Sequence, residues 1–90
     1  MPRWASRTDD NHSDLLATLR GLGWKMKSTH QLPDWVDAVG FHVRHGLTLF
    51  EFKVEDGPLT SSQEALLADG WPIVVIRSAD DAIAFTVRRS

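Results

Sequence analysis

Apolar and polar positions alternate along several stretches of the chain, and this pattern predicts β-strands. The clearest stretches are residues 24–29, 35–43 and 47–54, because a period of two is typical of a strand with one buried face. The turn between the last two, Arg44-His45-Gly46, is typical of a hairpin. A further run, residues 72–77, is rich in β-branched residues without alternation, and we expect a strand buried on both faces.

Helical spacing predicts the remaining elements. Leucines at positions 15, 16, 19 and 22 favour a helix over residues 11–22, with N-cap chemistry in Asp9-Asp10-Asn11 and an exit at Gly23. Thr60 or Ser61 is suited to cap a second helix that ends before Gly70. A short last helix is expected over residues 79–84, capped by Ser78.

The predicted order is helix, three strands in a meander, helix, strand and short helix. A helix joins the third strand to the fourth, so those two strands should be parallel neighbours with a right-handed crossover. We therefore expect a small α/β domain with a mixed sheet covered mainly by two helices. Residues 1–8 lack periodicity and are expected to form a flexible N-terminal arm, followed by a single domain over residues 9–90.

Composition narrows the class of protein only slightly. The 90 residues include 42% hydrophobic and 24% charged side chains, which is ordinary for a globular domain. The absence of cysteine excludes disulfides and thiolate zinc sites. No apolar run resembles a membrane span or a signal peptide, so an intracellular protein without a membrane partner is expected. The formal charge of −2 leaves nucleic-acid binding open.

The stretch Leu47–Val54 contains the most informative chemistry. The face of this strand that carries Leu47 and Leu49 continues with Glu51 and Lys53. A carboxylate and an ammonium therefore lie side by side on one face, next to a buried stretch. Charges in such a place cost stability unless they are paired or bind a metal. The competing interpretation is a surface ion pair on an edge strand.

Asp37 makes the metal interpretation more specific. It lies fourteen residues before Glu51 with a tight turn between the two strands, a spacing that can bring both carboxylates to the same end of an antiparallel hairpin. Such carboxylates repel unless a cation bridges them, and Mg²⁺ prefers oxygen ligands of this kind. A bound Mg²⁺ can activate water, and Lys53 would orient that water or stabilise developing charge.

This arrangement resembles the PD-(D/E)xK nuclease superfamily, whose core has the order helix, three strands, helix, strand. The chain is similar in particular to the small phage and prophage nucleases of the virus-type replication-repair kind, which are akin to Holliday-junction resolvases. The resemblance covers roughly residues 7–84 and implies a restriction-endonuclease-like αβββαβ core. Its local matches are Arg7-x-Asp9-x-Asn11, Asp34-Trp-Val-Asp37-Ala-Val-Gly40, Phe50-Glu-Phe-Lys53, Pro58-Leu-Thr-x-x-Gln63 and Ile73-Val-Val-Ile-Arg-Ser78.

The resemblance also implies roles for individual residues. Asp37, Glu51, the carbonyl of Phe52 and Asp14 would hold Mg²⁺ or Mn²⁺. The catalytic set would be Asp37, Glu51, Lys53 and Gln63. Asp14 could equally be an ordinary acid in the first turn of a helix, with His12 as a weaker candidate for its role, and Gln63 could be a solvated helix position.

Two features leave alternatives open. A literal Pro33-Asp34 pair competes with Asp37, although Asp37 has the better spacing to Glu51 and Asp34 is suited to a turn. The histidines, which number four, lack zinc-ligand spacing and are expected in turns or on solvent faces.

The function expected from this resemblance is a metal-dependent endonuclease that hydrolyses DNA phosphodiester bonds, with branched or flap DNA among the expected substrates. A homodimer in the cytoplasm of a bacterial host cell would suit so small an enzyme. The alternative is a catalytically inactive protein of the same fold that binds nucleic acid or a phage or host protein. Basic side chains that could contact phosphates are Lys25, Lys27, Arg44, Arg77, Arg88 and Arg89.

Overall fold

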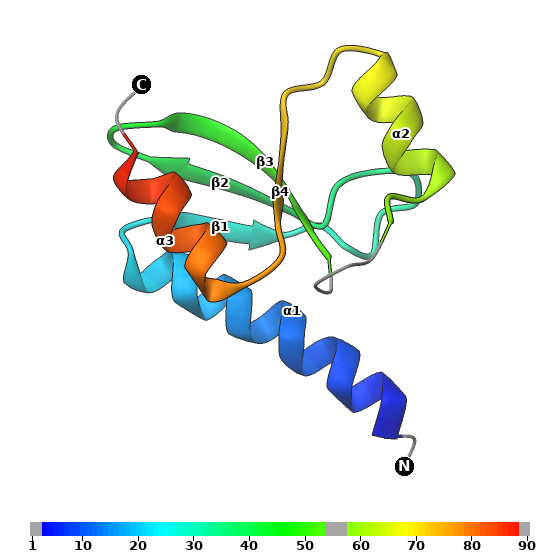
Figure 1. The fold of residues 1–90 in the computed structure, drawn as a ribbon, viewed down its shortest axis with the longest axis horizontal. Coiled ribbons are helices and arrows are strands. Elements are labelled where there is room, and N and C mark those ends of the chain that lie inside the picture. The colour runs from blue at the N-terminus through cyan, green and yellow to red at the C-terminus, as the bar shows by residue number, and fades with distance from the viewer. Residues whose placement is uncertain (1–2, 54–57, 89–90) are drawn as a thin grey trace.

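A single four-stranded sheet organises the chain, as seen in a computed structural model that describes residues 3–53 and 58–88. Figure 1 shows the elements in order: α1 (Arg3–Gly21), β1 (Lys25–Ser28), β2 (Ala38–His42), β3 (Gly46–Phe52), α2 (Ser61–Ala68), β4 (Ile73–Ile76) and α3 (Ala79–Val87). The predicted order of helices and strands is confirmed, and the chain is a compact α/β fold with a mixed sheet.

The sheet has the order β1-β2-β3-β4. The pairs β1–β2 and β2–β3 are antiparallel, with Lys25 opposite Phe41 and Phe41 opposite Leu47. Strand β4 runs parallel to β3 and places Val75 opposite Glu51. The predicted parallel pairing across a helical connection is therefore confirmed, and β3 is a central strand.

Helix α1 begins earlier than predicted. It starts at Arg3, so residues 3–8 are helical in backbone although we predicted a flexible arm over residues 1–8. The Asp9-Asp10-Asn11 segment accordingly lies inside the helix and does not cap it. The sequence pattern did not predict the start of this helix, because the apolar spacing typical of a helix begins only at Leu15, where the helix packs against the sheet.

The other two helices begin at the predicted caps. The Thr60 side chain accepts a hydrogen bond from the Gln63 amide, and the Gln63 side chain accepts one from the Thr60 amide, which is a complete capping box. The Ser78 hydroxyl accepts a hydrogen bond from the Asp81 amide at the start of α3. Helix α3 extends to Val87, beyond the predicted end at residue 84, because Phe85 packs against the core.

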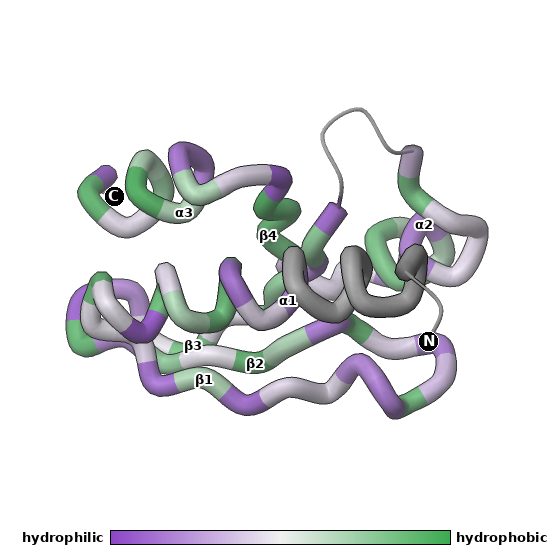
Figure 2. Tube along the Cα trace, turned by 90° about the horizontal axis from the view of Figure 1, so that it is seen from below, coloured by the Kyte–Doolittle hydropathy of each residue, from purple (hydrophilic) through white to green (hydrophobic). Residues whose placement is uncertain are grey.

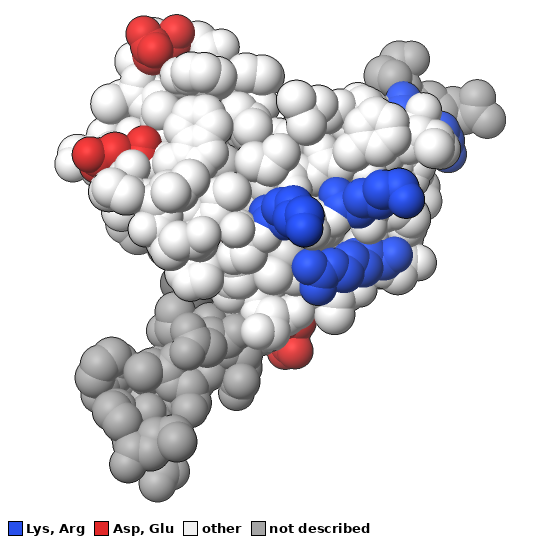
Figure 3. Space-filling view, turned by 180° about the vertical axis from the view of Figure 1, so that it is seen from behind, with Lys and Arg blue, Asp and Glu red and all other residues white. Residues whose placement is uncertain are grey.

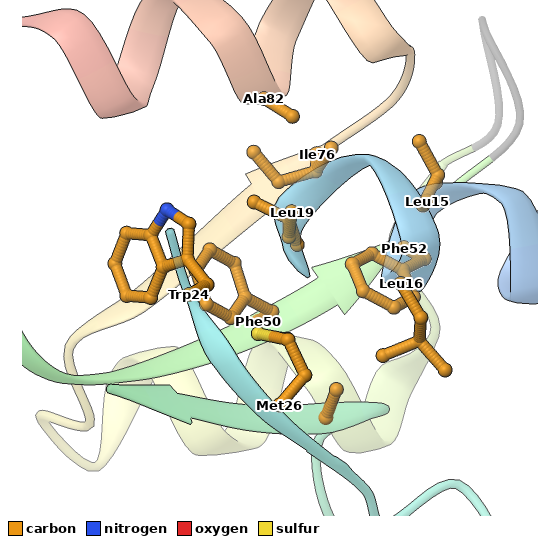
Figure 4. Close-up of a cluster of buried hydrophobic side chains, with 10 residues drawn as sticks. Leu15, Leu16, Leu19, Trp24, Met26, Phe50, Phe52, Ile76 and Ala82 are labelled. Atoms are coloured by element: carbon orange, nitrogen blue, oxygen red, sulfur yellow. The ribbon is translucent and has the colours of Figure 1, made fainter. Parts of the chain in front are cut away.

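One face of the sheet carries the core. Figure 2 shows α1 and α3 on the same side of β1, β2 and β3, and the core side chains come from these elements. Figure 4 shows the leucines of α1 gathered over the aromatic rings of β3. The buried cluster consists of Leu15, Leu16, Leu19, Trp24, Met26, Ala38, Phe50, Phe52, Ile76 and Ala82.

Strand β4 differs from its prediction. Only Ile76 of this strand is buried, and Ile73, Val74 and Val75 are half-buried. The prediction of a strand buried on both faces was wrong, because β4 lies at the edge of the sheet and α2 buries none of its own residues. None of the described helices is long and apolar enough to cross a membrane.

Two histidines belong to an aromatic cluster near the β2–β3 turn. His45 lies in this turn, as predicted, whereas His42 lies in β2 and does not face solvent. His42 is buried and its ring lies 5.0 Å from that of Trp24. The His45 ring stacks on Trp24 at 5.5 Å and on Phe85 at 5.0 Å. The Trp24 indole N–H donates to the Thr86 hydroxyl at 2.8 Å, so this cluster joins β1, the hairpin and α3.

Candidate metal centre

The end of β3 places Glu51 on the face of the sheet opposite the core. Its neighbours Phe50 and Phe52 point into the core beneath α1, and alternation turns Glu51 the other way. Glu51 is nevertheless only 1% exposed. A carboxylate that is this deeply buried is uncommon in proteins and requires compensation.

Asp37 lies beside Glu51 because it continues the β2–β3 ladder by one residue. The Asp37 amide donates to the Phe50 carbonyl at 3.1 Å. The Asp37 Oδ2 atom accepts a hydrogen bond from the Phe52 amide at 2.9 Å. A side-chain oxygen therefore occupies the place of the next backbone carbonyl, which fixes the Asp37 carboxylate at the strand end next to Glu51.

The electrostatics of Glu51 follow from this position. The pKa of Glu51 is raised from its ordinary 4.5 to about 7, chiefly by burial and secondly by the negative charge of Asp37, while the positive charge of Lys53 acts in the opposite direction. The Glu51 Oε1 atom is buried and has no hydrogen-bond partner among the described residues. The site thus favours either a proton on Glu51 or a cation against it.

The donor atoms around Glu51 fit a hard divalent cation. Asp37 and Glu51 supply carboxylate oxygens, and the backbone N–H of Phe52 points toward Asp37. The Phe52 carbonyl, the third predicted oxygen donor, belongs to the residue whose amide is hydrogen-bonded to Asp37. Oxygen donors with remaining positions taken by water are typical of Mg²⁺ and Mn²⁺ sites.

Asp14 does not join this pair of carboxylates. Its side chain is exposed on α1, and no group of three or more histidine or acidic side chains able to hold a metal occurs among the described side chains, those of residues 12–53 and 58–88. The structure therefore brings together two of the predicted carboxylate ligands and not the third.

Of the remaining predicted catalytic residues, Lys53 lies near Glu51, whereas Gln63 has a structural role in α2. Lys53 follows β3 directly, and its positive charge is close enough to lower the pKa of Glu51. Gln63 uses its side-chain oxygen to accept from the Thr60 amide at 2.8 Å. Its observed role is thus to cap α2.

Asp34 occupies a separate place in the turn before β2. It has a positive φ of 56°, and its Oδ1 accepts a hydrogen bond from the Ser62 hydroxyl at 2.7 Å. This contact ties the turn to α2. Of the two aspartates that the sequence left open, Asp37 is the one beside Glu51.

A pair of histidines lies on the α1 side of the strand end, and one of them, His12, is the residue named above as a weaker candidate for the role of Asp14. The Ser28 hydroxyl is 3.1 Å from His12 Nε2 and 2.8 Å from His30 Nδ1. The His12 ring also lies 5.1 Å from Phe52. The sequence contained a signal for His12, because positions 12, 15, 16 and 19 share one helix face.

Comparisons with models of known protein families, with curated proteins and with solved structures give no match to this chain.

Proposed function

We propose that this protein is a Mg²⁺- or Mn²⁺-dependent endonuclease of the PD-(D/E)xK kind, acting on DNA phosphodiester bonds. The observation that carries the proposal is the buried Glu51 carboxylate, whose Oε1 has no partner among the described residues, beside Asp37. Two adjacent carboxylates with an unsatisfied oxygen are the arrangement that a divalent cation stabilises.

The residues at the strand end have distinct tasks in this proposal. Asp37, Glu51 and the Phe52 carbonyl would hold the cation, which supplies a water of lowered pKa and neutralises charge on the phosphate. Lys53 lies two residues after Glu51 on the same face. Its ammonium group would orient the attacking water and offset negative charge that develops on the phosphoryl oxygens.

The architecture supports the same proposal. The order α1, β1, β2, β3, α2, β4 and the parallel β3–β4 pair match the expected αβββαβ core. Asp14 and Gln63 are not needed for the chemistry proposed here, since Asp14 is exposed and Gln63 caps α2. A homodimer would add a second site and more DNA-contacting surface, which is an argument from fold analogy.

The direct test is cleavage of labelled four-way junction, flap, single-stranded and duplex DNA with Mg²⁺ or Mn²⁺. We expect wild-type protein to cut at least one substrate and Glu51→Ala and Lys53→Ala to lose the activity. Glu64→Ala is the matched control, because Glu64 is an exposed acid on α2. Mn²⁺ binding, followed by electron paramagnetic resonance, should require Asp37 and Glu51 even if cleavage needs another partner.

The second candidate is a protein of the same fold that binds without cutting. It is favoured by the exposed apolar side chains Phe41 and Leu47, 45% and 74% exposed, because contact surfaces expose such groups. Binding of Mn²⁺ that does not depend on Asp37 and Glu51, together with no cleavage, would move the conclusion to this candidate.

A further inference from the structure

The outer face of β1, β2 and β3 is covered by none of the described helices over much of its area. Helices α1 and α3 both lie on the other side of these strands, as Figure 2 shows. On the outer face Lys25, Phe41 and Leu47 form one row across the sheet, by their register. All three are exposed, so this row is open to a partner.

The next rows lead from the open area to the candidate metal centre. Lys27, Val39 and Leu49 form the second row by register, and Asp37 and Glu51 follow at the strand ends. Four residues along a strand separate Phe41 from Asp37, or about 13 Å. The basic area, called here the lysine face, comprises Lys25, Lys27 and Phe41. It lies next to the proposed site along β2, where Val39 and Asp37 are partly exposed.

The charge of this face selects a polyanion. Figure 3 views the molecule from behind Figure 1, the side opposite α1 and α3, and shows Lys and Arg side chains gathered there with Asp and Glu at the margins. Lys25 and Lys27 point outward on the same face of β1, about 7 Å apart. Two such ammonium groups in a row suit successive phosphates of one strand.

The exposed ring of Phe41 favours single-stranded over double-stranded nucleic acid as the bound polyanion. This ring is 45% exposed between Lys25 and Leu47. Duplex DNA turns its phosphates outward and keeps its bases stacked inside, so an exposed aromatic ring gains little there. A single strand exposes base faces, and bases stack on aromatic side chains flanked by basic residues.

A second copy of the chain is a less suitable occupant. A two-fold symmetric contact would place the same patch against itself. Lys25 and Lys27 of one copy would then face the lysines of the other, and like charges in an interface cost affinity.

We propose that the lysine face binds single-stranded nucleic acid, with Lys25 and Lys27 on phosphates and Phe41 stacked on a base. The inference rests on the proposed nuclease function in one respect: the bound strand would run toward Asp37 and Glu51. It names the substrate class of that site, a single strand or the single-stranded part of a branched or flap structure. Binding itself requires neither metal nor cleavage.

The test is fluorescence anisotropy with a labelled oligothymidylate in EDTA, over a series of salt concentrations. We expect wild-type protein to bind the oligonucleotide more tightly than a hairpin duplex. Phe41→Ala should weaken binding about tenfold. The double variant Lys25→Gln/Lys27→Gln should reduce the slope of log affinity against log salt by about 1.4, since each phosphate contact on a single strand contributes about 0.7.

Ile83→Ala is the matched control for Phe41→Ala. Ile83 is an apolar residue of α3 that is 43% exposed, on the other side of the sheet, and its removal should leave affinity unchanged. All substituted positions are exposed, and circular dichroism verifies that each variant is folded. Unchanged binding by the Phe41 and lysine variants, or equal loss in Ile83→Ala, would overturn the inference. So would light scattering that shows a dimer lost in Phe41→Ala, because the face would then be an interface between copies.

The two proposals fail in different ways. If the lysine face binds oligonucleotide, neither metal yields cleavage and Mn²⁺ binding does not depend on Asp37 and Glu51, the binding inference stands and the nuclease proposal is rejected. If cleavage depends on Glu51 and Lys53 while the lysine-face variants bind normally, the nuclease proposal stands and the strand follows another route.

Discussion

Replacing Glu51 by glutamine should make the metal-free protein more stable at alkaline pH. Glutamine has nearly the same shape and cannot ionise, so the variant removes the buried charge without a cavity. The folded protein raises the pKa of Glu51 from 4.5 to about 7. At about 1.36 kcal/mol per pKa unit, this difference corresponds to a cost of about 3 kcal/mol when Glu51 ionises.

The sign of the effect depends on pH. The folded state holds the Glu51 proton more tightly than the unfolded state, so both states are protonated below pH 4.5 and the cost is absent there. The cost grows as pH rises and is complete above about pH 7. Wild-type protein should therefore lose about 3 kcal/mol through this interval from Glu51 alone, and Glu51→Gln should not.

The measurement is urea unfolding in EDTA at a series of pH values from 4 to 9, compared between wild type and Glu51→Gln. Glu64→Gln is the control, because Glu64 is exposed on α2. Adding Mg²⁺ at pH 8 should stabilise wild type and not the variant, since a cation that binds only the folded state raises its stability. Parallel stability profiles for wild type and Glu51→Gln would refute the reasoning, as would a variant that is less stable at every pH.

The remaining predictions concern packing and capping. Gly40→Ala should cost about 1–3 kcal/mol in chemical unfolding, because a Cβ atom there would lie 2.5 Å from a methionine sulfur of the core; Gly21→Ala, with nothing within 4 Å, should not destabilise, and equal losses would contradict this account. Trp24→Phe should cost about 1–2 kcal/mol, because the buried Thr86 hydroxyl loses its indole partner; a double-mutant cycle with Thr86→Val should show coupling, and additive losses would exclude it. Thr60→Ala should cost about 1 kcal/mol of local stability, read as faster amide exchange confined to α2, and unchanged exchange there would refute the role of the capping box.

The sequence predicted most of the strands because short-range pattern determines them. Alternation on β3 placed Phe50 and Phe52 in the core and Glu51 on the other face, as observed. The caps at Thr60 and Ser78 were also predictable, because capping chemistry acts over three residues. Features that depend on long-range contacts were harder to predict. The β-branched residues of β4 are typical of a central strand, yet β4 lies at the edge of the sheet.

The site was predictable in its centre and not at its margins. The spacing along the sequence predicted that Asp37 and Glu51 are neighbours, as observed. This works because each residue of one strand of an antiparallel hairpin has a defined partner on the other. The burial of Glu51 could not be foreseen, since it depends on segments remote in sequence. The Ser28 hydroxyl between His12 and His30 is likewise a contact between α1, β1 and the following turn, which local pattern does not report.

The β2–β3 register has a consequence for how this chain can vary. Glu51 faces outward and Phe52 inward only because Ala38 pairs with Phe50. A change in the length of the turn at residues 43–45 that slipped the pairing by one position would exchange the two faces of a strand. Phenylalanine would then replace carboxylate beside Asp37. Length changes in this turn are therefore tolerable only where they preserve the register, so the hairpin tip, usually the most permissive place for insertions, is here constrained by chemistry at the opposite end of its strands.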